Sequence, residues 1–132
     1  MKARPLRAEY DERGKIISYA KCVAQDATHV MLHAPGPFWC RIIPVILKGK
    51  RAGTGCWSWN GDVEKPTLKP SLKTWGPHAT DEQMARIKAG ENLKIPDTVC
   101  HSWINDGRIQ FLPDCTHELA GKTLDLLDVE EL

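Results

Sequence analysis

The sequence predicts a mainly β, α+β fold, namely a single small antiparallel β domain with one short helix. Short runs of β-branched and aromatic residues alternate with polar positions, and clusters of Gly, Pro, Asn and Asp separate them. The strongest local signal is Asp106-Gly107, because a two-residue type I′ turn needs a positive φ at both central positions. The length of 132 residues suits one domain with a modest core, and we expect residues 1–132 to form it.

In the N-terminal half, the strand-like runs lie on either side of recognisable turns. Asp11-Glu12-Arg13-Gly14 should connect a hairpin, since its glycine suits a left-handed conformation. Pro35-Gly36-Pro37 reads as a second turn. The segment from Gly49 to Gly55 lacks the spacing and the following helix of a phosphate-binding loop, so we read it as a turn as well. The strands expected here are Leu6–Tyr10, Lys15–Tyr19, Thr28–His33 and Phe38–Leu47.

A tryptophan pair and a proline-rich stretch follow in Cys56–Leu72, CWSWNGDVEKPTLKPSL. Strand alternation puts Trp57 and Trp59 on one face, and two such indoles belong more often to a core than to a ligand platform. Pro66 and Pro70 argue against a central strand, because proline has no N–H to give to a ladder.

One segment has the signals of a helix. Thr80 can cap its start, Gln83 completes a capping box, and Gly90 can end it. We interpret residues 77–97 around it as a helical insertion within the domain, and we expect this insertion to cover a sheet edge or the mouth of a pocket.

The hairpin and its exit, Thr98–His117, contain two of the five cysteines, two of the five histidines and one of the five tryptophans. Pairing outward from the turn puts Ser102 opposite Phe111 on an apolar face that also carries Cys100. His101 and Trp103 then share the other face. We expect Cys100 to be a buried small hydrophobe, and His101 to be the better candidate for function.

Charge and hydropathy exclude several classes of protein. The formal net charge of +1, from 18 Lys+Arg against 17 Asp+Glu, gives no argument for a nucleic-acid partner. The longest apolar run, Ile42–Leu47, is too short to cross a bilayer, and the N-terminus has no signal-peptide core. An odd number of cysteines without paired spacing favours reduced thiols. We therefore expect a cytoplasmic protein with no membrane partner.

Two stretches resemble a known family. They are WSWNGDVEKPTLKPSL, from Trp57, and CHSWINDGRIQFLPDCTHELAGKTLDL, from Cys100. Their pattern of W-x-W-N-G, P-T-x-x-P-S, C-H, D-G-x-I-x-F and D-[CS]-T-H-x-L-A-G is similar to small proteins encoded by phages, prophages and some bacterial defence islands. Some members carry the label ammonia monooxygenase, which we reject because that enzyme is a membrane metalloprotein. Relatives beside ubiquitin-like conjugation genes imply a peptidase-like role in a bacterial cytoplasm.

The chain departs from that family at a zinc knuckle. The family typically reads C-P-G-C-x-x-H ahead of an I-P-V strand, whereas Ala34 and Pro37 stand here in place of both cysteines. The knuckle loop is therefore degenerate, and packing by Phe38 and Trp39 would stabilise this end instead. We expect no cofactor. The alternative is a zinc ion held by Cys40, His101, Cys115 and His117.

Four polar residues of the shared motifs have nucleophile or base character: Ser71, His101, Asp114 and His117. A serine hydroxyl is a weak nucleophile until a base takes its proton, and the base needs an orienting partner. Ser71 with His101 fits that logic, and Asp114 or His117 could orient the imidazole. For Asp114 we favour the alternative that it only satisfies backbone groups at a turn, as Thr116 would. The side chains expected to contact a ligand are Trp59, Asn60, Thr67, Trp103 and Cys115, with Asn60 or the N–H groups after it as oxyanion donors.

Three functions from different classes remain open. The first is a small phage-type hydrolase, acyl-transfer in type, that uses Ser71 and His101 on a peptide or isopeptide bond of a protein substrate. The second is a phage accessory or counter-defence protein without catalysis, which binds a host defence protein or a nucleotide through exposed tryptophans. The third is a metal-binding structural domain. The first predicts that Ser71 and His101 meet in a cleft between the proline-rich segment and the polar face of the hairpin.

Overall fold

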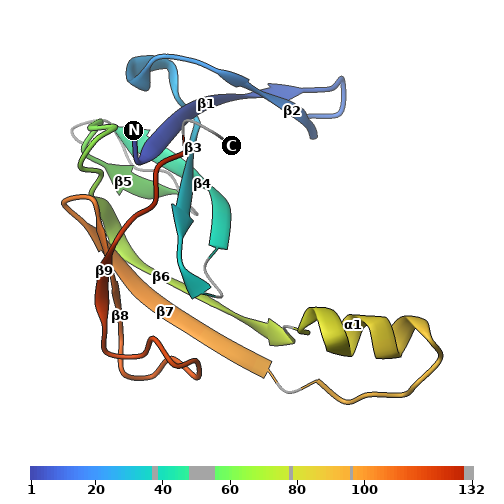
Figure 1. The fold of residues 1–132 in the computed structure, drawn as a ribbon. Coiled ribbons are helices and arrows are strands. Elements are labelled where there is room, and N and C mark those ends of the chain that lie inside the picture. Colours follow the sequence, from blue (N-terminus) through green and yellow to red (C-terminus); the bar gives the residue numbers. More distant parts are fainter. Residues whose placement is uncertain (37–38, 48–55, 78, 96, 130–132) are drawn as a thin grey trace.

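The computed structural model describes residues 1–36, 39–47, 56–77, 79–95 and 97–129. Their strands form one sheet in the order β2-β1-β3-β4-β5-β6-β7-β8-β9, in which all neighbours are antiparallel except β4 and β5. The sheet curls, so that β1 and β2 cross one end of the molecule and β6, β7 and β8 form the other (Figure 1). The strands are β1 Ala3–Tyr10, β2 Ile16–Lys21, β3 His29–Ala34, β4 Trp39–Leu47, β5 Trp57–Trp59, β6 Leu68–Pro77, β7 Asp97–Asn105, β8 Arg108–Phe111 and β9 Thr123–Asp125. The predicted mainly β fold is confirmed.

The hairpin of β7 and β8 has the predicted turn and register. Asp106 and Gly107 have φ values of 51° and 77°, as a type I′ turn requires. Ser102 pairs with Phe111, so the apolar and polar faces of this hairpin lie as expected. A Cβ on Gly107 would lie 3.2 Å from the carbonyl oxygen of Glu64, so a larger residue would be crowded here as well as strained by the positive φ.

The N-terminal hairpin is also present. Strands β1 and β2 pair around a turn in which the carboxylate of Asp11 accepts hydrogen bonds from the N–H groups of Arg13 and Lys15. Gly14 has a φ of 78°, so it takes the left-handed position that the sequence predicted.

The expectation that Pro66 and Pro70 exclude a central strand is wrong. Pro66 precedes β6, but Pro70 lies within it, and β6 pairs with β5 on one side and β7 on the other. The reason is a register shift. Leu68 pairs with Ile104 and the next pair is Leu72 with Ser102, so the ladder to β7 is interrupted at Pro70. Pro70 has no N–H to donate, and the interruption means that no carbonyl group of β7 depends on it for a ladder hydrogen bond.

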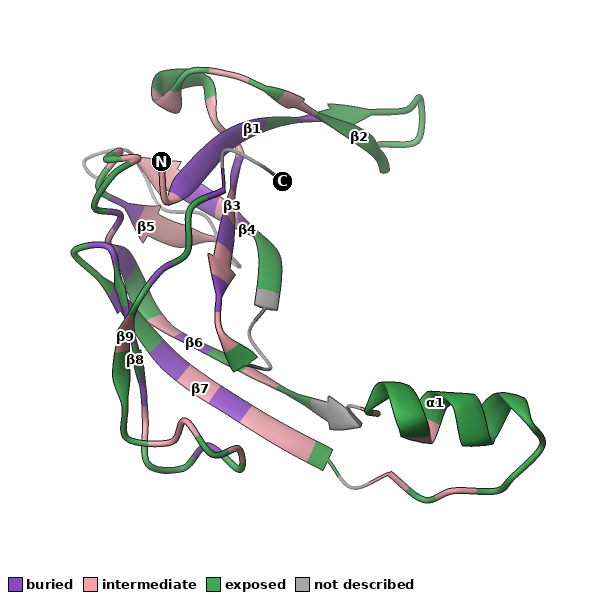
Figure 2. Ribbon diagram, viewed as in Figure 1, coloured by how far each residue is buried: buried purple, intermediate pink, exposed green. Residues whose placement is uncertain are grey.

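The core is formed by the concave side of the sheet, and Figure 2 shows buried residues alternating with exposed ones along β7. Trp59, Phe111 and Ile104 are among its fully buried large side chains. Cys100 is 4 % exposed and belongs to this core, as predicted.

Helix α1, Asp81–Lys88, has the predicted cap but not the predicted place. The Thr80 hydroxyl accepts from the Gln83 N–H, and the Gln83 side chain accepts from the Thr80 N–H. The helix has no buried residue and projects past the ends of β6 and β7, so it covers neither a sheet edge nor a pocket mouth among the described residues (Figures 1 and 2). Within the same ranges, no helix is long and apolar enough to span a membrane.

Three predicted features fall on residues outside the described ranges: Pro37 of the 35–37 turn, the packing role of Phe38, and the turn at residues 49–55. The short strand β9, which pairs with β8, was not predicted from the sequence. It follows a set of hydrogen-bonded turns over residues 116–122.

Candidate functional site

Ser71 lies in the register shift of β6. Lys69, Pro70 and Ser71 stand opposite the single residue Trp103 of β7. Bulges of this kind bend a strand and re-aim its side chains, and they are frequent beside active sites. Since Leu72 points into the core, its neighbour Ser71 faces the opposite side of the sheet, which is the polar face of the β7–β8 hairpin.

His101 occupies that same face and meets Ser71 directly. The Ser71 Oγ lies 2.9 Å from the His101 Nε2. The other ring nitrogen, Nδ1, lies 3.0 Å from Oδ2 of Asp114. The three side chains therefore form a continuous relay from hydroxyl to imidazole to carboxylate, contributed by β6, β7 and the turn after β8.

The charge of Asp114 determines which ring nitrogen carries the proton. The hydrogen bond from His101 is the main cause that holds the pKa of Asp114 below its ordinary value, so this carboxyl group is ionised at neutral pH and only accepts. The Nδ1 of His101 must then carry the proton, which leaves the Nε2 lone pair facing the Ser71 hydroxyl. This tautomer is the one that a general base for Ser71 requires.

Two residues that the sequence did not assign to this site support the arrangement. The indole Nε1 of Trp57 donates to the Ser71 carbonyl oxygen at 3.3 Å, which fixes the backbone at Ser71. Lys73 pairs with His101 across the two strands, and its charge contributes to the lowered pKa of Asp114. Strand alternation from Ser71 could have indicated Lys73, but no sequence signal joins Trp57 to Ser71.

The loop before β6 ties the two strands of the site together. The Pro66 carbonyl accepts from the Gly107 N–H at 3.0 Å, and the Thr67 hydroxyl accepts from the Asp106 N–H at 2.9 Å. The β7–β8 turn is therefore anchored to the start of β6, which sets the position of His101 relative to Ser71.

Asn60 stabilises this loop, and the expectation that it serves as an oxyanion donor is not supported. Its amide Nδ2 donates to the Lys65 carbonyl, and its Oδ1 accepts from the N–H groups of Asp62 and Thr67. Asp62 accepts in turn from the N–H groups of Glu64 and Lys65. The N–H groups of Asp62, Glu64, Lys65 and Thr67 are thus bonded within the loop, and the positive φ here belongs to Gly61.

The other expected ligand contacts divide into buried and accessible residues. Trp59 is fully buried, so it cannot stack on a ligand and belongs to the core. Trp103 is 38 % exposed and lines a hollow of about 270 Å³ together with Thr67, Lys69, Asn105 and Gln110. Neither Ser71 nor His101 lines this hollow, but Trp103, which does, stands opposite the register shift that carries Ser71.

His117 does not orient His101. Its ring packs edge-on against Phe111, with centroids 4.9 Å apart, and burial lowers its pKa. Phe111 lies on the apolar face of the hairpin, so His117 lies on the opposite side of the sheet from the relay. Of the two candidates for the orienting partner, the structure brings only Asp114 to the imidazole.

The structure also separates the four expected metal ligands. Cys40 is exposed on β4 and His101 is bonded to Ser71 and Asp114, whereas ligand atoms of Cys115 and His117 lie within 4.8 Å of one another and of Cys100. In the part of the chain that the structure describes, these three residues form the group that could hold a metal ion. However, the Leu119 N–H donates to Nδ1 of His117, so in this orientation Nε2 carries the ring proton and has no lone pair for a metal.

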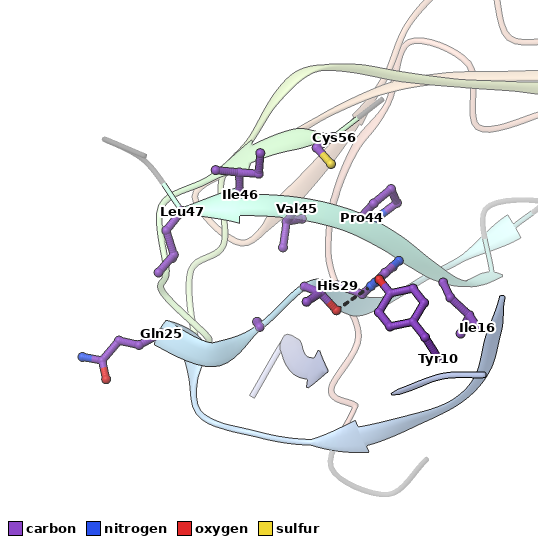
Figure 3. Close-up of a pocket in the computed structure, with 11 residues that line it drawn as sticks. Tyr10, Ile16, Gln25, His29, Pro44, Val45, Ile46, Leu47 and Cys56 are labelled. Carbon is purple, nitrogen blue, oxygen red and sulfur yellow. Dashed lines mark hydrogen bonds between the residues drawn. The ribbon is translucent and has the colours of Figure 1, made fainter. Parts of the chain in front are cut away.

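A separate hollow of about 480 Å³ lies between the β1–β2 hairpin and β4, away from the relay (Figure 3). Its walls are largely apolar, and they include Tyr10, Ile16 and Leu47. The His29 ring there is bonded to the Thr28 hydroxyl, and burial lowers its pKa. No carboxylate among the described residues lines this hollow, so the Thr28–His29 pair lacks an orienting partner such as the one that Asp114 provides for His101.

Comparison with known proteins agrees with the geometry. No curated protein and no solved structure matches the chain. The sequence model of the family described as "Bacterial ubiquitination-like system serine protease (BubE)" matches residues 11–112, which include both Ser71 and His101. The chain therefore belongs to the family of bacterial ubiquitination-like system serine proteases.

Proposed function

We propose that the protein is a serine peptidase or isopeptidase in which Ser71 is the nucleophile, His101 the general base and Asp114 the orienting carboxylate. The observation that carries this proposal is the relay itself, with 2.9 Å from Oγ to Nε2 and 3.0 Å from Nδ1 to Oδ2. Both distances are those of hydrogen bonds, and the order of the groups is that of a catalytic triad. The family description supports the same class of reaction.

In the acylation step, the Ser71 oxygen attacks the carbonyl carbon of the substrate amide while Nε2 of His101 takes the hydroxyl proton. Asp114 stabilises the imidazolium that results, because its negative charge lies at Nδ1. His101 then returns the proton to the amine nitrogen as the C–N bond breaks, which leaves an ester between the acyl group and Ser71.

In the deacylation step, a water molecule loses a proton to His101 and attacks the ester carbon. The proton passes from His101 back to the Ser71 oxygen as the acid product leaves. The reaction consumes one water molecule and needs no oxidant or reductant. Asp114 is half exposed and His101 is partly exposed, so both steps occur at a site that water can reach.

The substrate that suits this site is a protein segment in extended conformation. The hollow at the register shift is bounded by the indole of Trp103, the ammonium group of Lys69 and the side-chain amides of Asn105 and Gln110. An indole can pack on a peptide group, and amides can bond to backbone N–H and C=O groups. The family description names a ubiquitination-like system, and we therefore propose that the bond cleaved is a peptide or isopeptide bond of a protein in such a system.

A simple ester tests the reaction before a natural substrate is known. With p-nitrophenyl acetate, we expect turnover that falls on the order of 10³-fold or more in Ser71→Ala and in His101→Ala. The double variant should be no slower than either single variant, since members of one catalytic unit are not additive. Ser18→Ala, which removes an exposed hydroxyl of β2, is the matched control and should keep full activity.

The proposal fails if Ser71→Ala and His101→Ala stay folded and keep the activity of the parent protein. A loss of partner binding in a folded Trp103→Ala variant, with Ser71→Ala unaffected in every assay, would instead favour the binding protein that the sequence left open.

A further inference from the structure

The turn that carries Asp114 is attached to β7 by hydrogen bonds on both sides of that residue. Before it, the Leu112 N–H donates to the His101 carbonyl at 2.9 Å. After it, Thr116 exchanges two bonds with Val99: its hydroxyl accepts from the Val99 N–H at 2.8 Å, and its own N–H donates to the Val99 carbonyl at 3.0 Å.

Between these anchors, the Cys115 thiol bonds to the backbone of His101 in both directions. The His101 N–H donates to Sγ at 3.2 Å, and the thiol donates to the His101 carbonyl oxygen at 3.1 Å. Cys115 is 8 % exposed, so little water is present to replace these bonds.

The thiol replaces a backbone hydrogen bond that would otherwise continue the pairing of β7 and β8. In a regular antiparallel ladder, His101 and Leu112 would exchange both N–H···O bonds. Here the Leu112 carbonyl accepts instead from the Cys115 N–H at 3.1 Å, because the chain turns back after β8. The His101 N–H would lose its ladder partner at this point, and the Cys115 sulfur accepts its hydrogen bond.

The consequence reaches the relay because Asp114 directly precedes Cys115 and its own side chain is half exposed. Water competes for an exposed carboxylate, so its bond to Nδ1 of His101 depends on the backbone that presents it. The same sulfur holds the backbone of His101 and the turn of Asp114, and so it sets the two groups relative to each other.

We propose that Cys115 is a positioning residue for the His101–Asp114 pair. This inference rests on the proposed function for its effect on rate, but its structural part concerns the Nδ1–Oδ2 hydrogen bond and is measurable without turnover. Cys115 does not touch the reacting atoms, and its thiol remains a thiol throughout the reaction.

The test compares Cys115→Ala, Cys115→Ser and Cys100→Ala. Cys100 is the matched control, because it is a second buried cysteine whose thiol faces the core and meets the thiol of Cys115, whereas the hydrogen bonds to the His101 backbone come from Cys115. The first readout is the NMR signal of the Nδ1 proton of His101, which persists only while the carboxylate holds it. The second is the rate of p-nitrophenyl acetate hydrolysis.

We expect Cys115→Ala to lose the Nδ1 proton signal and to lower kcat about 10- to 100-fold with little change in KM, as misplacement of a catalytic group does. Cys115→Ser should restore the signal and most of the rate, since a hydroxyl also donates and accepts. Cys100→Ala should lower the melting temperature and keep the signal. If Cys115→Ala does not fold, Cys115→Val gives the same comparison with a somewhat larger apolar side chain that fills the space of the thiol.

The positioning role is overturned if folded Cys115→Ala or Cys115→Val keeps both the Nδ1 signal and kcat, or if Cys100→Ala abolishes the signal equally. Failure of the proposed function would look different. The signal would then respond to Cys115 as described, while the unaltered protein and Ser71→Ala would hydrolyse the ester at the same rate.

Discussion

Leu68 and Leu72 are four positions apart on β6, yet their partners on β7, Ile104 and Ser102, are only two positions apart. The extra length of β6 is the segment that ends in Ser71. This difference in spacing turns Ser71 towards His101 while both leucines remain buried in the core. Ser71 is therefore positioned by an irregularity of the sheet and not by its regular pairing.

Trp57 should matter for the geometry of that segment. Trp57→Phe keeps an aromatic ring but removes the Nε1 donor to the Ser71 carbonyl. We expect the free energy of unfolding to fall by about 0.5–1.5 kcal/mol, the usual contribution of one hydrogen bond. Urea denaturation measures this change, and Trp75→Phe, which alters an exposed indole, is the control. Equal stability of Trp57→Phe and the parent protein would mean that this bond does not hold the bulge.

Asp114 should determine the tautomer of His101. In Asp114→Asn the side chain keeps its shape, but its amide can donate a hydrogen bond to Nδ1 of His101. This favours the tautomer with the ring proton on Nε2, and a protonated Nε2 cannot accept the Ser71 hydroxyl proton. We expect kcat for ester hydrolysis to fall on the order of 10⁴-fold with an unchanged melting temperature. Asp125→Asn, which affects only the exposed pair with Arg108, should leave kcat as it was. A similar kcat in Asp114→Asn and the parent protein would show that the carboxylate has no catalytic role.

The sequence predicts one side of the site, the β7–β8 hairpin, better than the other, strand β6. The hairpin of β7 and β8 was predictable because Asp106-Gly107 fixes the register, and alternation then gives the face of His101. The contact between Ser71 and His101 agrees with the pairing that the sequence suggested. Strand β6 was misjudged because Pro70 reads as a strand breaker, and periodicity cannot show that a bulge absorbs it.

The orienting partner was left open for a related reason. Asp114 and His117 lie in an irregular turn, where no periodicity tells which side chain reaches which face of the sheet. The structure resolves the alternative through the bonds of Cys115 and Thr116 to β7, which direct Asp114 towards His101. The favoured structural role is correct for Thr116, whose hydroxyl accepts from the Val99 N–H, and wrong for Asp114, whose carboxylate bonds to an imidazole.

His117 should make the protein less stable in acid. Burial lowers its pKa from the ordinary value near 6.5, so the folded protein binds this proton less readily than the unfolded chain does. Its contribution to stability is complete above pH 6.5 and is lost as the pH falls through the lowered value. His117→Phe removes this contribution. We therefore expect the free energy of unfolding of the variant to increase relative to that of the parent protein as the pH is lowered from 8 to 5. A difference that stays constant over this range would contradict the argument.

Chelation should have little effect on stability. Ala34 and Pro37 replace the two knuckle cysteines, and the ring of His117 is bonded to the Leu119 N–H in a way that leaves no lone pair for a metal at Nε2. We expect protein purified without a metal-binding tag to keep its melting temperature in EDTA. Stoichiometric zinc by elemental analysis, together with a large fall in melting temperature on chelation, would assign a metal to Cys100, Cys115 and His117 and refute this prediction.

The central claim is that Ser71 is a nucleophile activated by His101, and covalent labelling tests it most directly. A fluorophosphonate reacts with an activated serine: the Oγ–P bond forms, fluoride leaves, and the base takes the hydroxyl proton. The account predicts one adduct per chain, which peptide mapping by mass spectrometry places on Ser71. It should be absent in Ser71→Ala and strongly slowed in His101→Ala, and unchanged in Ser18→Ala. An adduct on another residue, or equal labelling of folded Ser71→Ala, would contradict the account.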